Sequence, residues 1–422
     1  MITSKEIRHW GETDTVERQE AWAALLLEID ARISLAPTQY EGLEQRYSSV
    51  SAILEDPHDP LLGDLLVYPQ GSFSTRTVTR PPGREDVDVD AIAYVIGGTL
   101  LSPMELLDRL FDELESRVRT GGSVSLSKRC VTVQYRDTSL PCHMDVTPAE
   151  RQPENPSDDG SGRLRVPDRP TRGWSPSNPK DFANWFDKCA AMKLQIQLPD
   201  SYRNFVIARG DTEPLPSHEE ISAPNGLRVA VRLMKRHRDV YVERTMRQKS
   251  KPISVIITTL AAKAYERVVR RSRGQIFSPL DTLVAIAEEM SKCFDASTEN
   301  EPYRLLNPRD PDENFAEKWN SNPALHSTFT AWQKDLTQTL RYGLINFPSR
   351  ERFRTELSEI FGTSVGTACD DFFATIADGV YPGLSAAAAQ QARVAGRSAA
   401  LIGLGRSEPV RPAEPEPLDR LG

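Results

Sequence analysis

The sequence has few cysteines, no long apolar run and no excess of positive charge. Its five cysteines among 422 residues are scattered and lack CxxC spacing, which excludes a disulfide framework and a cysteine-based zinc site. The longest apolar runs, such as residues 255–262, are much shorter than a membrane span. No cationic stretch followed by an apolar segment opens the chain. We therefore expect a cytoplasmic protein with no membrane contact.

The charge balance bears on the partners. The formal net charge is −8, whereas proteins that grip long RNA or DNA gain most of their affinity by neutralising phosphates with basic residues. Long nucleic acid is therefore an unfavourable partner, and small nucleotides fit better. A chain of 422 residues also exceeds one comfortable hydrophobic core, so we expect more than one domain.

Periodicity and turn residues predict a sheet core followed by helices. Residues 60–150 have the pattern of an α+β sheet core, preceded by helices at 15–35 and 38–54. Residues 151–179 are rich in Pro, Ser, Asp and Gly, which predicts a long loop. A strand is predicted at 87–95 within the sheet core, and from residue 181 the pattern is mostly helical, including predicted helices at 314–340 and 350–361. We divide the chain into residues 1–180 (N-terminal helices and sheet core), 181–400 (helical lobe) and 401–422, a Pro- and Glu-rich tail expected to be disordered.

Two neighbouring stretches carry chemistry: YPQGSFSTRT at residues 68–77 and EDVDVD at residues 85–90. The backbone of a Gly-Ser turn, here Gly71 and Ser72, can cradle a triphosphate. Carboxylates two residues apart on a strand point to the same face. Together they would hold Mg²⁺ against the triphosphate, which is the chemistry of a nucleotidyltransferase.

Three aspartates compete for the metal-binding pair: Asp86, Asp88 and Asp90. The apolar run at residues 91–95 must enter the core. A charged Asp90 left outside the site would lie nearest that core, which is costly without a partner. We therefore prefer Asp88 and Asp90. Asp86 either supports these ligands from behind or faces solvent.

A third carboxylate is expected from a neighbouring strand, and Asp145 is the candidate because it is a lone acid between Met144 and Val146. In a two-metal scheme Asp88 and Asp90 would bind both Mg²⁺ ions, with Mn²⁺ as a substitute. Asp145 would complete the site of the ion that activates the attacking hydroxyl. Each piece alone is weak, since an alternating acidic strand is usually a solvated edge. Their conjunction favours a polymerase-β-like nucleotidyltransferase site.

The chain also resembles a known family. The motifs YPQGSF with Thr77, VDVDA and CHMDVTP resemble those of the bacterial cGAS/DncV-like nucleotidyltransferases (CD-NTases), the SMODS-type second-messenger synthases of CBASS anti-phage systems. Further matches lie at residues 233–239, 252–262 and 307–319. The similarity spans roughly residues 40–340. It implies a bilobed fold like those of cGAS and oligoadenylate synthetase, in which a nucleotidyltransferase sheet core faces a helical second lobe.

The resemblance implies roles for individual residues. Gln70, Gly71 and Ser72 would contact the triphosphate of ATP or GTP, and Asp88, Asp90 and Asp145 would bind Mg²⁺. Lys235 and Ser254 match the Lys and Ser with which the helical lobe holds the triphosphate. An ammonium group suits a phosphate, although the segment LMKRHRD also fits a solvated helix face.

Four other residues stand out near these motifs. Arg76 departs from the family pattern, because relatives often have Gly there, which leaves open the conformation of the loop and would let Arg76 itself reach a phosphate. His237 is expected to be structural, because nucleotidyl transfer needs no histidine. Phe315 and Trp319 fit either the nucleotide cleft or the core.

The predicted activity is Mg²⁺-dependent joining of NTPs into a cyclic di- or trinucleotide. One alternative is a template-independent RNA-tailing nucleotidyltransferase, against which the acidic balance argues. The other alternative is a non-catalytic nucleotide-binding signalling protein, against which the intact carboxylates argue.

The C-terminal residue, Gly422, follows a proline-broken segment and resembles the tails of CD-NTases that ubiquitin-transferase-like partners conjugate to a target. The alternative is a tail end with no role. If Gly422 is conjugated, its deletion abolishes a covalent adduct of higher mass on denaturing gels of cells that carry the partner. An adduct that survives the deletion contradicts the assignment.

Overall fold

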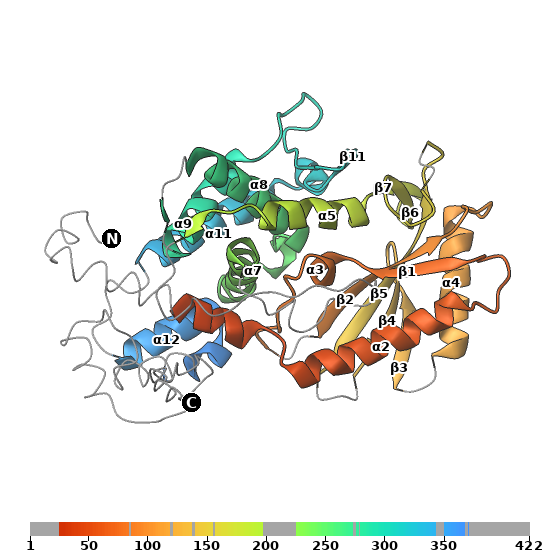
Figure 1. The fold of residues 1–422 in the computed structure, drawn as a ribbon, viewed down its shortest axis with the longest axis horizontal. Helices are drawn as coiled ribbons and strands as arrows, with labels where there is room; N and C mark the ends of the chain where they lie inside the picture. Colours follow the sequence, from red (N-terminus) through yellow and green to blue (C-terminus); the bar gives the residue numbers. More distant parts are fainter. Residues whose placement is uncertain are drawn as a thin grey trace, which may run out of the picture.

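The chain forms a lobe built on a seven-stranded sheet and a lobe built of helices (Figure 1). Each lobe has its own large hydrophobic core. The computed structural model describes residues 25–370 apart from 84–85, 119–120, 137–139, 155–156, 197–224, 273–275, 278, 343–349 and 368–369. The predicted α+β fold, a sheet core with a helical second lobe, is confirmed. The tail at 401–422, including Gly422, lies outside the described residues.

The sheet has the strand order β1-β2-β5-β4-β3. β2 and β5 are parallel neighbours, and the other adjacent pairs along this path are antiparallel. The chain passes from β2 through α4, β3 and β4 to reach β5, so the parallel pair is joined by a long connection. The bounds are β1 Leu65–Pro69, β2 Val87–Val95, β3 Gly122–Leu126, β4 Val131–Tyr135, β5 Cys142–Arg151 and α4 Pro103–Arg117.

The two faces of β2 differ because buried residues alternate with more exposed ones in its first half. Val87 and Val89 are buried in the core beneath the sheet, together with residues of α2 (Pro37–Glu55) and α4. Asp88 and Asp90 therefore share the opposite face. From Ala91 onward both faces of β2 are buried. The chemistry-bearing face is thus confined to the start of the strand.

The prediction of a long loop at 151–179 is wrong. This segment forms a hairpin of β6 (Leu164–Asp168) and β7 (Gly173–Ser177), and β6 pairs with the end of β5. Leu164 and Val166 are buried against the second face of β2. The strands were not predicted because each is short and contains a proline, which the sheet accepts at an edge position.

The helical lobe is built around α7 (Gly226–Arg244), which packs against α8, α9, α11 and α12. The predicted helix over 314–340 is two helices, because Asn322 ends α10 and Pro323 begins α11. The preceding β10–β11 hairpin was not predicted. The bounds are α5 Pro179–Ala190, α8 Ser254–Ser272, α9 Pro279–Glu289, α10 Glu317–Ser321, α11 Pro323–Tyr342, α12 Arg350–Phe361, β8 Gln195–Ile196, β9 Ile276–Phe277, β10 Leu306–Asn307 and β11 Asp310–Asn314.

The helical lobe also contains a segment that precedes the sheet core in the sequence. Residues 25–33 are helical and were grouped with the sheet core, but Leu25, Leu26 and Ile29 are buried in the core of the helical lobe. A short amphipathic helix buries its apolar side wherever a matching apolar surface lies, whatever its place in the sequence.

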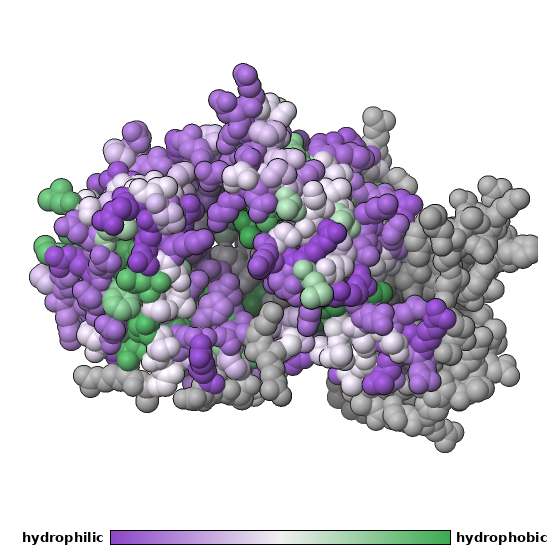
Figure 2. Space-filling model, turned by 180° about the vertical axis from the view of Figure 1, so that it is seen from behind, coloured by the Kyte–Doolittle hydropathy of each residue, from purple (hydrophilic) through white to green (hydrophobic). Residues whose placement is uncertain are grey.

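The outer surface is largely hydrophilic on the face seen in Figure 2, with scattered apolar residues. Among the described residues, no helix is long and apolar enough to cross a membrane.

His237 illustrates how the helical lobe buries a polar side chain. Its ring is fully buried, and Nδ1 accepts a hydrogen bond of 3.0 Å from Trp332 Nε1. Indole N–H only donates, so Nδ1 is unprotonated and the proton of the neutral ring lies on Nε2. The Nε2 proton faces Asp335 Oδ2, which lies 3.4 Å away. The neutral ring can therefore interact with this carboxylate without becoming charged. Burial, with Arg244 nearby, lowers the pKa of His237 to about 3.

This pKa predicts a loss of stability in acid. Below its usual value of about 6.5, His237 takes up a proton in the unfolded chain but not in the folded one. Lowering the pH from 7 to 5 should therefore remove about 2 kcal/mol of unfolding free energy through this group. His237→Asn, whose amide oxygen can still accept from Trp332, should show a correspondingly weaker dependence in denaturant titrations. Equal pH slopes for both proteins would contradict the assignment.

Candidate functional site

The predicted carboxylates meet on one face of the parallel pair β2 and β5. In the register of these strands Asp90 lies opposite Asp145, and Asp88 lies opposite His143. Side chains opposite each other on neighbouring strands share a face, so four polar groups gather over two strands. Thr132 on β4, opposite Asp145, donates a 2.6 Å hydrogen bond to Asp145 Oδ1 and orients that carboxylate.

These side chains form a donor set suited to a divalent cation. Ligand atoms of Asp88, His143 and Asp145 all lie within 4.8 Å of one another. Burial, together with the charges of Asp88 and Asp145, raises the pKa of Asp90 to about 8. Like charges held this close oppose ionisation until a cation joins them. The arrangement therefore favours a bound cation on electrostatic grounds.

His143 was not among the predicted site residues. Its Nε2 lies 3.3 Å from Asp88 Oδ1, and this hydrogen bond raises the pKa of the imidazole. The sequence did contain a pointer, because His143 stands two residues before Asp145 and so shares its face. Nucleotidyl transfer needs no histidine, so the chemistry alone gives no reason to expect a histidine paired with a carboxylate at this site.

Asp86 takes the supporting position. Its Oδ2 accepts a 2.6 Å hydrogen bond from Gln134 Nε2 and lies 3.9 Å from His143 Nδ1. It is therefore neither a member of the close donor group nor free in solvent.

The Gly-Ser turn is the start of a one-turn helix, α3 (Gly71–Ser74). Gly71 has φ +64°, and a Cβ atom added there would lie 2.0 Å from Asp90 Oδ2. Both the backbone conformation and the close approach therefore require glycine. The backbone N–H of Gln70 donates to Asp90 O at 2.9 Å, and its side-chain amide points to Thr147 Oγ1 at 3.5 Å. The turn is thus fastened directly to the strand that carries the aspartates.

Lys235 lies on α7 and is not part of a solvated helix face. It is 6% exposed, and its Nζ donates to Thr77 O at 2.9 Å. Burial, followed by the charge of Arg238, lowers the pKa of the ammonium to about 8, while Asp88 and Asp90 act in the opposite direction. Lys235 therefore contributes positive charge to the carboxylate face from the opposite lobe.

Ser254 begins α8, and its Oγ accepts a 3.0 Å hydrogen bond from Arg238 Nη1. Arg238 also donates to Pro252 O at 2.9 Å and pairs with Asp239. Sequence reasoning did not single out Arg238 as a site residue, because a cation in the run LMKRHRD gives no hint of which side is buried.

A cleft of about 2040 Å³ lies between the sheet and the helical lobe. Phe315 lines it and contacts Phe182 edge to face, whereas Trp319 is buried in the helical core. All of the predicted site residues line this cleft: Gln70, Gly71, Ser72, Asp88, Asp90, Asp145, Lys235 and Ser254.

Comparison with known proteins agrees with this geometry. Residues 26–189 match the family model of the SMODS domain, the Second Messenger Oligonucleotide or Dinucleotide Synthetase domain. The c-di-GMP synthase of Roseivirga ehrenbergii is 27% identical over 307 residues, which cover 72% of this chain and 74% of that protein. The cyclic dinucleotide synthase CdnG of Bradyrhizobium diazoefficiens is 28% identical over 359 residues, covering 82% and 81%.

A solved structure shares the fold. The structure of Bradyrhizobium diazoefficiens CdnG in complex with GTP matches with a TM-score of 0.61 and 24% sequence identity. The match covers 82% of this chain and 98% of that one.

The contact between Gly71 and Asp90 can be tested against a matched glycine. Gly63 has φ +65°, but a Cβ atom there would meet nothing within 4 Å. Gly71→Ala and Gly63→Ala should each lose about 1 kcal/mol of stability from the left-handed backbone. Only Gly71→Ala should also weaken Mn²⁺ binding, measured by calorimetry, because it displaces Asp90. Unchanged Mn²⁺ affinity in Gly71→Ala would contradict this geometry.

Proposed function

We propose that this chain, like the bacterial cGAS/DncV-like CD-NTases that it resembles, joins nucleoside triphosphates into a cyclic oligonucleotide second messenger with Mg²⁺ as its cofactor. One observation carries the proposal: Asp90 lies opposite Asp145 on parallel strands while the Gly71 turn packs against Asp90. In this arrangement the backbone that would cradle the phosphates lies directly beside the carboxylates that would hold the cation.

Asp88, Asp90 and Asp145 would hold the metal, since carboxylate oxygens are the donors that Mg²⁺ prefers. The bound metal would lower the pKa of the attacking hydroxyl and stabilise the charge that develops on the phosphate. Imidazole nitrogen is a poorer ligand for Mg²⁺, so we assign His143 to orienting Asp88, from which it is 3.3 Å away. Mn²⁺ is the expected substitute ion.

The triphosphate would lie between the lobes. Gly71 and Ser72 would present backbone N–H groups to it from the sheet side. Lys235 and Ser254, on α7 and α8, would contact it from the helical lobe. The Lys235 ammonium has three donors, so it can keep its hydrogen bond to Thr77 O while binding a phosphate oxygen.

GTP is the first substrate to test, because one relative is named a c-di-GMP synthase and the solved structure of CdnG contains GTP. ATP is the second. The product would act as a signal in CBASS anti-phage defence, made in the cytoplasm, where NTPs occur. Conjugation of Gly422 to a target by a ubiquitin-transferase-like partner remains part of this proposal.

Incubation of the protein with the four NTPs and Mg²⁺ should yield a phosphatase-resistant product of cyclic mass by mass spectrometry. Asp90→Asn or Asp145→Asn should lower its rate of formation by about 10³-fold, because each removes a metal ligand. Asp86→Asn is the matched control on the same strand face and should keep most of the activity. Products that are entirely phosphatase-sensitive linear chains would refute cyclisation, and incorporation into added RNA would favour the tailing alternative.

A further inference from the structure

One side of α7 contacts the loop that follows the Gly-Ser helix. Three cations spaced about one helical turn apart along α7, and a fourth next to the last of them, each donate to a backbone carbonyl of residues 75–80. These four hydrogen bonds fix the path of the loop. The pairs are Arg228 Nε with Thr75 O (3.3 Å), Arg232 Nη1 with Arg76 O (3.1 Å), Lys235 Nζ with Thr77 O (2.9 Å) and Arg236 Nη2 with Arg80 O.

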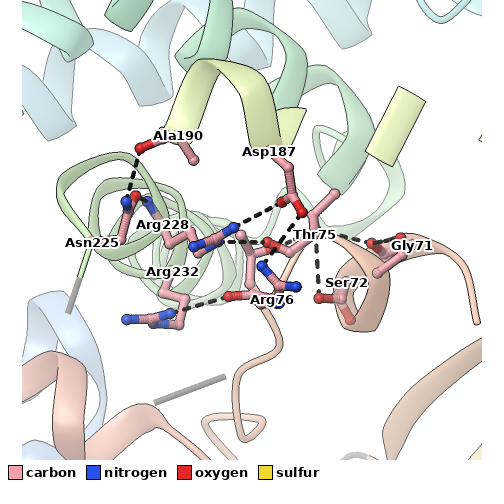
Figure 3. Close-up of polar contacts among 11 residues, drawn as sticks. Gly71, Ser72, Thr75, Arg76, Asp187, Ala190, Asn225, Arg228 and Arg232 are labelled. Atoms are coloured by element: carbon pink, nitrogen blue, oxygen red, sulfur yellow. Dashed lines mark hydrogen bonds and ion pairs between the residues drawn. The ribbon is translucent and has the colours of Figure 1, made fainter. Parts of the chain in front are cut away.

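Two acids complete this contact. Asp187 of α5 lies between Arg228 and Arg76, at 2.8 Å and 3.4 Å, so it ties the helical lobe to the loop (Figure 3). Arg232 is fully buried and makes two hydrogen bonds to Asp30, at 2.7 Å and 2.6 Å. The pair of Arg228 and Asp187 is partly exposed, whereas the pair of Arg232 and Asp30 is buried. Only the first pair can therefore be altered without endangering the fold.

Arg76 is held in an unusual backbone conformation. Its φ is +56°, a left-handed value that is costly for a residue with a Cβ atom. Its N–H donates to Phe73 O at 3.0 Å, and its carbonyl accepts from Arg232. The guanidinium is directed to Asp187 (Figure 3), and Arg76 is not among the residues that line the cleft. Arg76 thus acts on the loop and not on a phosphate.

The loop in turn holds the Gly71–Ser72 turn. Thr75 Oγ1 donates to Gly71 O at 2.9 Å, and Thr77 N donates to Ser72 O at 2.8 Å. Thr75 and Thr77 also share a 2.9 Å hydrogen bond between their hydroxyl groups. The carbonyls of the turn therefore point back into the loop, so a shift of the loop moves the turn.

We propose that Arg228, Asp187 and Arg76 form a positioning cluster that sets the affinity for the nucleotide triphosphate without touching it. The cluster fixes residues 75–77, and these residues fix the Gly71–Ser72 turn. The turn therefore has its binding conformation before the triphosphate arrives. This inference rests on the proposed function, because it takes the turn as the triphosphate cradle. None of the three residues lines the cleft, and the family motifs pointed only to Arg76.

The test is binding of Mg²⁺ with a GTP analogue that carries a methylene group between the α- and β-phosphorus atoms. Arg228→Met, which keeps the volume of the side chain but loses its charge, should raise the Kd about tenfold, the effect of losing a charge-assisted hydrogen bond. The KM for GTP should rise by a similar factor, and kcat should change less than about threefold. Arg228→Lys, which keeps a charge toward Asp187, should recover part of the affinity.

Arg244→Met is the matched control, because Arg244 is also on α7 but pairs with Asp335, away from the loop. It should bind the analogue like the wild type. Arg76→Gly is the second variant: glycine accepts the left-handed conformation without strain, so the fold is preserved while the contact with Asp187 is lost. It should raise the Kd without lowering the melting temperature.

The outcomes are distinct. If the wild type does not bind the analogue, the proposed function fails and the positioning role fails with it. If the wild type binds and both Arg228→Met and Arg76→Gly bind equally well, the cluster is only structural and the inference is overturned. Should Arg228→Met unfold, the Kd of Arg76→Gly decides alone. A fall in kcat with unchanged Kd also overturns it.

Discussion

Electrostatic repulsion among carboxylates on one sheet face is the constraint on which the rest of this structure depends. Asp88, Asp90 and Asp145 approach one another because parallel pairing of β2 and β5 leaves them no other position. Burial, together with the charges of Asp88 and Asp145, raises the pKa of Asp90 to about 8. Nearby positive charge lowers the electrostatic cost of such a face, and Lys235 of the helical lobe supplies part of it.

The helical lobe places positive charge near these carboxylates through α7. This helix is buried along most of its length, yet it carries Lys235 and three arginines toward the sheet lobe. Lys235 lies within electrostatic range of Asp88 and Asp90, while its neighbours hold the loop after the Gly-Ser helix. Assembly of the two lobes and shaping of the cleft therefore depend on the same contacts, so the Gly71–Ser72 turn is positioned by the helical lobe as well as by the sheet.

Local patterns predicted the elements whose signals are strong. The alternation in residues 87–95 predicts β2 with the same bounds that the structure shows, and the periodicity of 350–361 does the same for α12. The hairpin of β6 and β7 was not predicted, because five-residue strands containing Pro167 and Pro176 look like loops. Their burial depends on the apolar second face of β2, which no local window reveals.

The sequence by itself determined which aspartates share a face, because side-chain direction on a strand follows from a period of two. It also determined that a turn containing Gly71 precedes the strand that carries them. Only the tertiary structure decided that Asp145 lies opposite Asp90, that His143 pairs with Asp88, and that Arg228 and Asp187 hold the loop. These contacts join residues 41 to 153 positions apart in the chain. Strand register and lobe packing set such contacts, and both arise from burial of the whole chain instead of from any local pattern.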